Sequence, residues 1–190
     1  MTETITPSQT VGPFFHYGLI RPGQTDIAPS QVPGQRIVVE GRVLDGDGQP
    51  VPDAMIEVWQ ADAEGRYAHP ADPHGRGANS GFAGHGRAPT DTAGVWRVTT
   101  VKPGAVPHPK GGTQAPHLTL GVFARGLLLR LHTRLYFDDE AANATDPVLA
   151  SIDADRRGTL IAKGDAAGGT PVYRLDIRLQ GDGETVFFLA

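Results

Sequence analysis

Histidine and serine are the residues of this 190-residue chain most able to do chemistry, as metal ligands, bases or nucleophiles. Seven histidines are enough for a metal site, but no two have the close spacing of a ligand pair. His69 and His74 are separated by prolines, and His108 and His117 lie farther apart still. No serine stands in a G-x-S-x-G elbow, and the absence of cysteine excludes disulfides and thiolate sites. Residue types alone therefore predict neither a serine triad nor a metal centre.

Short strands are the elements that would position any functional residues. Segments rich in β-branched or aromatic residues, separated by turn residues, cover 37–44, 55–61, 95–101, 117–124, 132–137, 173–180 and 185–189. Helical periodicity is missing, and the best helix candidate, residues 146–152, starts with Asp146 as N-cap and Pro147 at the first helical position. We therefore predict an all-β fold, an antiparallel β-sandwich with long loops and little helix.

The chain length fits one domain with an arm. Residues 1–34 are punctuated by Pro and Gly and contain the aromatic residues Phe14, Phe15 and Tyr17, so we predict an N-terminal arm that packs on its own domain and on a partner. Residues 35–190 are predicted to form the sandwich domain. Residues 64–94, with three histidines, are predicted to be a long loop that carries function or makes contacts.

Charge and hydropathy exclude several kinds of partner. A net charge of −4 and a pI near 5.9 provide no field that would attract nucleic acid or anionic lipid. The N-terminus lacks the basic start and apolar run of a signal peptide, and no apolar stretch is long enough for a membrane span. We expect a cytoplasmic protein with neither nucleic-acid nor membrane partners.

One alternative remains open at this point, a non-enzymatic β-sandwich that binds a small molecule or a carbohydrate. A stacking platform would need exposed aromatic residues, whereas Trp59 and Trp96 both lie in predicted strands where burial in the core is expected. The acidic run 138–140 directly follows a predicted strand and is interpreted as a solvated turn.

Several stretches, read in order, resemble the intradiol ring-cleavage dioxygenases. They are Thr-Pro-Ser-Gln-Thr-Val-Gly-Pro-Phe-Phe at 6–15, Glu-Val-Trp-Gln-Ala-Asp-Ala-Glu-Gly-Arg-Tyr at 57–67, Thr-Val-Lys-Pro-Gly at 100–104, Phe-Ala-Arg-Gly at 123–126, Leu-His-Thr-Arg-Leu-Tyr-Phe-Asp-Asp-Glu at 131–140 and Gly-Asp-Gly-Glu-Thr-Val-Phe-Phe at 181–188. The match runs from about Thr6 to the end of the chain. The resemblance implies a β-sandwich core and an oxidoreductase that acts in the catabolism of aromatic compounds.

Members of this family hold ferric iron with two tyrosines and two histidines, and this chain departs from that pattern. The resemblance places Tyr67 and His117 at two of the four ligand positions, and Val106 and Thr119 at the other two. Gln114 stands where catalytic chains have an arginine. A valine cannot donate to a hard ferric ion. The resemblance therefore implies that this chain holds no metal and that these four positions are vestigial.

Metal-free α subunits are known in this family, and the resemblance is to them. It implies a homologous catalytic β subunit as partner in a large hetero-oligomer, with Fe(3+) held by the β subunit. It places Thr10, Gly12, Pro13 and Arg125 at the mouth of the partner's site, where they bind the substrate. This chain alone would be inactive and have no catalytic residue of its own.

The implied reaction of the assembly is the O2-dependent cleavage of protocatechuate (3,4-dihydroxybenzoate) to 3-carboxy-cis,cis-muconate in the β-ketoadipate pathway. A rival within the same family is a self-sufficient dioxygenase with unusual ligands, which the iron content of the isolated chain would distinguish.

Overall fold

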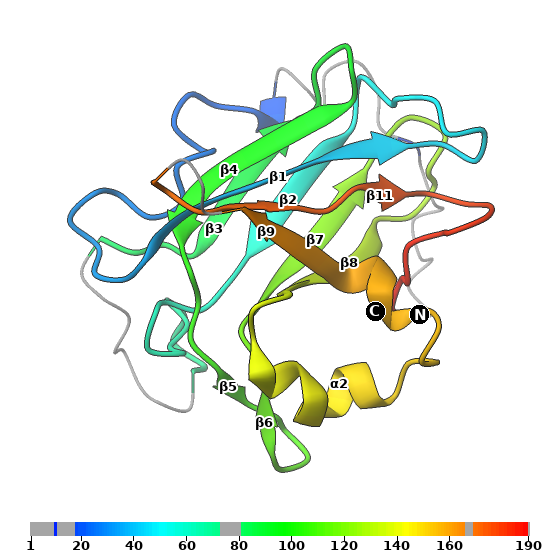
Figure 1. The fold of residues 1–190 in the computed structure, drawn as a ribbon. Coiled ribbons are helices and arrows are strands. Elements are labelled where there is room, and N and C mark those ends of the chain that lie inside the picture. Colours follow the sequence, from blue (N-terminus) through cyan, green and yellow to red (C-terminus); the bar gives the residue numbers. More distant parts are fainter. Residues whose placement is uncertain (1–9, 11–17, 73–80, 166–168, 190) are drawn as a thin grey trace, which may run out of the picture.

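The computed structural model describes residue 10 and residues 18–72, 81–165 and 169–189, whose fold Figure 1 shows. Strands dominate it: β1 (Arg36–Leu44), β2 (Met55–Trp59), β3 (His85–Pro89), β4 (Val95–Val101), β5 (Val106–Pro107), β6 (Thr113–Gln114), β7 (His117–Phe123), β8 (Leu131–Phe137), β9 (Ile161–Asp165), β10 (Val172–Arg174) and β11 (Ile177–Arg178). The helical segments are short: the 3₁₀-helices η1 (Ala141–Thr145) and η2 (Arg157–Leu160), and the α-helix α2 (Pro147–Ala150).

One sheet includes nearly all of these strands, in the order β11-β1-β10-β9-β8-β7-β2-β3, with β4 paired to β1. The sheet folds over on itself, so that β4, β1 and β11 lie in front of β2, β3, β7 and β8 in Figure 1. β9 joins the two parts, because it pairs with both β10 and β8. The ribbon β5–β6 and helix α2 lie together at one end (Figure 1). The predicted fold class, a mostly β sandwich with little helix, is confirmed.

The core lies between the two parts of the folded sheet. Trp96 on β4 and Phe137 on β8 are fully buried, together with Ile56, Leu118 and Leu120. Trp59, at the end of β2, is only partly buried. The predicted burial in the core therefore holds for Trp96 but not for Trp59.

Most predicted strands are found within two residues of their predicted ends, but two predictions are wrong. Residues 185–189 form no strand and make only a single bridge, between Phe188 and His132. The strand predicted at 173–180 is interrupted between β10 and β11, where the chain passes close over β1. A Cβ on Gly41 would lie 1.7 Å from the carbonyl oxygen of Leu175, so this approach requires glycine.

Strand β3 lies inside the stretch predicted as a long loop. Its sequence, His-Gly-Arg-Ala-Pro, has low strand propensity, and its pairing with β2 is what makes it a strand. β9 and the ribbon β5–β6 were likewise not predicted. The sheet also contains parallel pairs, β1 with β10 and β11, and β8 with β9, where only antiparallel pairs were predicted.

The helix predicted from Asp146 and Pro147 is present as α2, and its cap is confirmed. One carboxylate oxygen of the fully buried Asp146 accepts the backbone N–H groups of Val148 and Leu149, each at 2.8 Å. The other oxygen accepts the N–H of Ala115 at 2.7 Å. Asp146 therefore ties the helix to the segment that leads into β7.

Lys102 binds the acidic turn after β8. The turn is therefore tied to the protein, whereas a solvated turn was predicted. Lys102 Nζ lies 2.9 Å from both carboxylate oxygens of Asp139 and 2.7 Å from Glu140. The hydroxyl of Tyr173 donates to Asp139 at 2.8 Å, and Lys102 lies over the rings of Phe137 and Tyr173. This network fixes the Lys-Pro-Gly turn after β4 to the end of β8.

Residues 18–34 pack on the sandwich, as Ile27, Ala28 and Val32 are buried and the N–H of Ile27 donates to Thr99. Phe14, Phe15 and Tyr17 of the predicted arm lie outside the described residues, and the division at residue 34 stays a prediction. Within the described ranges, no helix has the length and hydropathy needed to cross a membrane.

Candidate functional site

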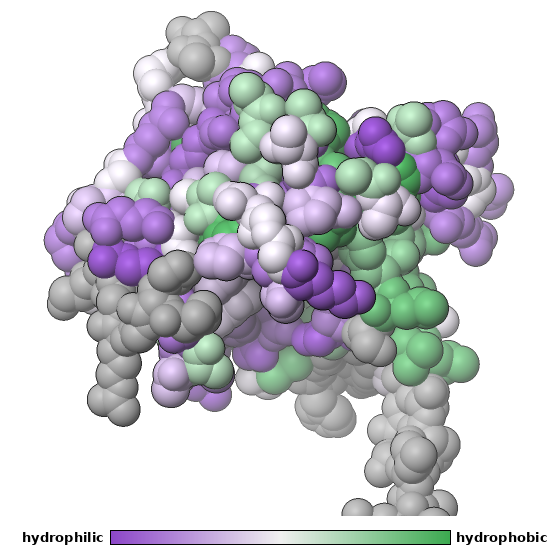
Figure 2. All heavy atoms as spheres, turned by 90° about the horizontal axis from the view of Figure 1, so that it is seen from below, coloured by the Kyte–Doolittle hydropathy of each residue, from purple (hydrophilic) through white to green (hydrophobic). Residues whose placement is uncertain are grey.

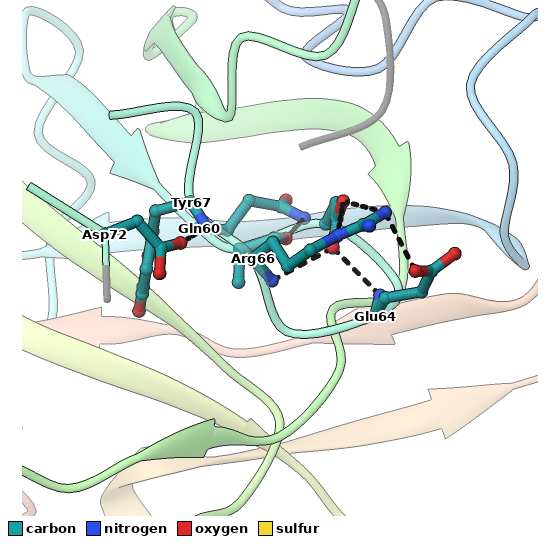
Figure 3. Close-up of polar contacts among 7 residues, drawn as sticks. Gln60, Glu64, Arg66, Tyr67 and Asp72 are labelled. Atoms are coloured by element: carbon teal, nitrogen blue, oxygen red, sulfur yellow. Dashed lines mark hydrogen bonds and ion pairs between the residues drawn. The ribbon is translucent and has the colours of Figure 1, made fainter. Parts of the chain in front are cut away.

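A turn at the end of β2 leads the chain to Tyr67 (Figure 3). The side chain of Gln60, fully buried, donates to the carbonyl oxygens of Ala61 and Val101 and accepts from Thr100 at 2.8 Å. The buried carboxylate of Asp62 accepts the N–H groups of Glu64 and Arg66 at 2.9 and 3.0 Å. The Gln-Ala-Asp stretch therefore anchors β2 to β4 and shapes the turn.

Glycine is required within this turn. Gly65 has a φ of +78°, and a Cβ there would lie 2.1 Å from the carbonyl oxygen of Ala105. The N–H of Gly104 donates to the backbone carbonyl oxygen of Asp62 at 2.8 Å. The turn carrying Tyr67 is thus packed against the segment that enters β5 at Val106.

Tyr67 stacks on Trp59, with ring centroids 5.8 Å apart and an angle of 5° between the rings. Its backbone N–H donates to the carboxylate of Asp72. Burial raises the pKa of the phenol and the charge of Asp72 adds to this, while Arg134 opposes it. Tyr67 is therefore a neutral, packed phenol at neutral pH.

Gln114 lies opposite Val106 in the ribbon β5–β6, and both are buried. Its amide nitrogen donates to the carbonyl oxygen of Pro107 at 2.9 Å, and its Oε1 accepts from Arg134 Nη1 at 2.7 Å. Gln114 thus uses its donor to close the ribbon and its acceptor to hold a guanidinium.

His117 opens β7 and is buried, with its ring 5.5 Å from that of Tyr136, its partner on β8. Nδ1 lies 2.7 Å from the carbonyl oxygen of Ala115, which can only accept, so Nδ1 carries the proton. Burial, with Arg134 nearby, lowers the pKa of His117 to about 4. The imidazole is therefore neutral at pH 7.

Arg134 on β8 is the residue that connects these positions. It lies opposite Thr119 of β7 and donates through Nη1 to Gln114 at 2.7 Å and to the hydroxyl of Tyr136 at 3.1 Å. The Tyr136 hydroxyl in turn lies 3.4 Å from Asp146. A chain of polar contacts thus links the buried carboxylate of Asp146 to the guanidinium.

The four positions that the resemblance assigned as vestigial are brought together. Tyr67 stacks on Trp59, and Trp59 pairs with Thr119 in the sheet. Thr119 also pairs with Arg134. Arg134 in turn donates to Gln114, which lies opposite Val106, and to Tyr136, whose ring lies near that of His117. This donor set does not fit a ferric ion, because a valine and a threonine stand where an anionic and an imidazole ligand are needed. The guanidinium of Arg134, opposite Thr119, has no lone pair to donate. In the part of the chain that the structure describes, no group of three His, Cys, Asp or Glu side chains could hold a metal.

The predicted substrate-binding residues lie elsewhere, beyond the far end of β7. The backbone N–H of Gly126 donates to the hydroxyl of Thr10 at 2.8 Å, so Thr10 does lie beside the segment of Arg125. The guanidinium of Arg125 is exposed and lies 2.9 Å from the carboxylate of Asp53. Gly12 and Pro13 lie outside the described residues.

Sequence reasoning missed Arg134, Tyr136 and Asp146 as members of the site. Arg134 and Tyr136 lie in the family-like stretch 131–140, but only the register of β7 against β8 places them beside Thr119 and His117. The contact with Tyr136 is what brings Asp146 to the site. Alternation along the predicted strand at 132–137 could have placed Arg134 and His132 on the same face, away from the core.

Comparison with known proteins agrees with this geometry. A family model described as a dioxygenase matches residues 12–181. The alpha chain of protocatechuate 3,4-dioxygenase from Pseudomonas putida is 46% identical over 196 residues, covering 96% of this chain and 95% of that one. The beta chain of the Burkholderia cepacia enzyme is 39% identical over 159 residues, covering 78% of this chain and 66% of that one.

Solved structures give the same class. The dioxygenase domain of a carbohydrate-binding fusion protein from Streptomyces sp. SirexAA-E superposes with a TM-score of 0.64 at 27% identity, covering 93% of this chain and 98% of that one. The fold is thus that of a ring-cleaving dioxygenase. This chain belongs to the intradiol dioxygenase family.

Proposed function

We propose that this chain is the metal-free α subunit of a protocatechuate 3,4-dioxygenase. The observation that carries the proposal is the similarity to the Pseudomonas putida alpha chain over nearly the full length of both proteins. The departures at Val106 and Thr119 support it, since a self-sufficient dioxygenase would need ligands there. The dioxygenase match also favours an enzyme subunit over a carrier module.

The partner in this proposal is a homologous β subunit that holds the ferric iron, in a cytoplasmic hetero-oligomer. Similarity to a beta chain supports the pairing, because homologous folds can build a quasi-symmetric interface. Figure 2 shows hydrophobic residues gathered along one edge of a mostly hydrophilic view. Leu128 and Leu129, in the loop between β7 and β8, are 59% and 69% exposed, as expected of residues that a partner covers.

Arg125 has the role of binding the substrate carboxylate in this proposal. It lies two residues beyond the end of β7, whereas His117 opens that strand, so Arg125 is too far away to serve this chain's own vestigial site. Its exposed guanidinium is free to reach a partner's site once it leaves Asp53. Guanidinium is the side chain best suited to paired hydrogen bonds with a carboxylate.

The test is reconstitution. This chain and a homologous chain carrying both tyrosines and both histidines are expressed separately and together, and O2 uptake with protocatechuate is measured beside iron content. Activity is expected only when both chains are present, with iron following the partner. Iron and full activity in this chain alone would overturn the proposal, as would full activity of the partner alone.

A further inference from the structure

We infer that the guanidinium of Arg134 occupies the vestigial metal site as a built-in cation, so that restoring the two missing ligands would not by itself restore metal binding. This concerns the chain's own vestigial site and holds whether or not the assembly cleaves protocatechuate. The inference gives Arg134 a part in excluding metal. This part is additional to the replacement of two ligands by Val106 and Thr119.

The position of the guanidinium is fixed by its contacts. Nη1 is shared between Gln114 Oε1 at 2.7 Å and the Tyr136 hydroxyl at 3.1 Å, and Cζ lies 6.0 Å from the ring centroid of Phe188. Gln114 is itself held by Pro107, and Tyr136 is fully buried. The side chain is therefore anchored on two sides rather than extended into solvent.

Three of the four vestigial positions are paired with Arg134 or with one of its two hydrogen-bond partners. Thr119 is the strand partner of Arg134, Val106 is the ribbon partner of Gln114, and His117 is the strand partner of Tyr136. The charge of Arg134 opposes the rise in the pKa of Tyr67 and lowers the pKa of His117, which agrees with a guanidinium close to both rings.

The site already holds a positive and a negative charge without a metal. A guanidinium stays protonated at any pH at which the protein is folded, and Asp146 provides a buried negative charge behind Tyr136. A ferric ion entering the site would meet the fixed positive charge at close range and at reduced solvent screening. It would also have to displace two hydrogen bonds that Arg134 makes.

The experiment restores the two missing ligands in chains that keep Arg134 and in chains that lack it. It uses the full chain, together with any partner needed for solubility. The double variant Val106→Tyr/Thr119→His restores a phenol and an imidazole, and adding Arg134→Gln removes the charge while keeping a donor for Gln114. A matched control adds Arg97→Gln instead, an exposed arginine on β4 that pairs with Glu40. Iron per chain above wild type and the tyrosinate-to-iron absorption band are measured.

We expect no added iron in the double variant or in the Arg97 control, and about one added iron per chain, with the visible band, in the variant carrying Arg134→Gln. Stoichiometric iron in the double variant would overturn the inference. So would a folded triple variant, shown by circular dichroism, that takes up none.

A milder pair keeps the inference testable if tyrosine does not fit at the buried position 106. Thr119→His adds one imidazole at a partly buried position, and its zinc affinity is measured by calorimetry with and without Arg134→Gln. At least a tenfold gain from Arg134→Gln is expected, and Arg134→Lys, which keeps the charge, should give none. Equal affinities for Arg134→Gln and Arg134→Lys would show that charge is not what excludes the metal.

Discussion

Gln114 Oε1 accepts a hydrogen bond of 2.7 Å from Nη1 of Arg134, so a neutral amide faces this guanidinium. The resemblance to catalytic chains places an arginine at position 114, and here the cation comes from β8 instead. Positions 114 and 134 are therefore coupled. A second arginine, at position 114, would remove the acceptor of Arg134 and would place two positive charges together.

The first prediction follows from that pairing. Gln114→Arg should lower the free energy of unfolding by about 2 kcal/mol, because it removes an acceptor and places two guanidiniums in contact. The exchanged variant Gln114→Arg/Arg134→Gln should recover most of the loss, which a double-mutant cycle by urea denaturation measures. Simple additivity of the two losses would show that the residues are not coupled.

The second prediction concerns Arg125 in the active assembly. Arg125→Ala should lower kcat/KM for protocatechuate by about 10- to 150-fold, through KM, if one charged hydrogen bond worth about 1.5–3 kcal/mol is lost. Catechol, which lacks the carboxylate, should be affected much less, and iron content should not change. Equal losses for both substrates would indicate a structural role for Arg125.

The third prediction concerns the lysine under the acidic turn. Lys102→Met should destabilise the chain by about 2 kcal/mol, because the lysine side chain is 12% exposed and its loss leaves two carboxylates close together. Lys163→Met is the control, since that side chain is 78% exposed and its Nζ lies 3.9 Å from Asp138, and it should cost less than about 0.5 kcal/mol. Thermal melts of the two variants compare them directly, and equal shifts would contradict the network.

The fourth prediction is a pH dependence of stability. The pKa of His117 is lowered to about 4 in the folded chain from an ordinary value of 6.5, so only the unfolded chain takes up this proton between those values. Stability due to neutral His117 is thus complete above pH 6.5 and is lost as the pH falls toward 4, by up to about 3 kcal/mol.

His117→Asn, whose amide can still donate to Ala115, should flatten the fall in unfolding free energy between pH 6.5 and 4. The same substitution at His108, in the β5–β6 loop, controls for loss of an imidazole as such. An unchanged slope in His117→Asn would show that this histidine does not govern acid stability.

Much of the fold could be predicted from local sequence. Alternation of apolar residues gave most strands, and the Asp-Pro pair gave α2 and its cap. Prediction failed where tertiary contacts override propensity: β3 becomes a strand by pairing with β2, and residues 185–189, although apolar, do not form one. The candidate site was predicted only in part. The resemblance identifies Tyr67 and His117 as ligand positions, whereas Arg134, although it lies in the family-like stretch 131–140, matches no ligand position.

The class of fold, the family and the replacement of two ligands by Val106 and Thr119 could all be predicted from the residues, because these depend on residue identity and local pattern. Which group takes the place of the metal depends on tertiary contacts. Arg134, Gln114 and Asp146 are distant in sequence, and they meet because the register of β7 against β8 and the cap of α2 bring them to one place. A guanidinium in that position is a consequence of register, which long-range pairing sets and local sequence does not.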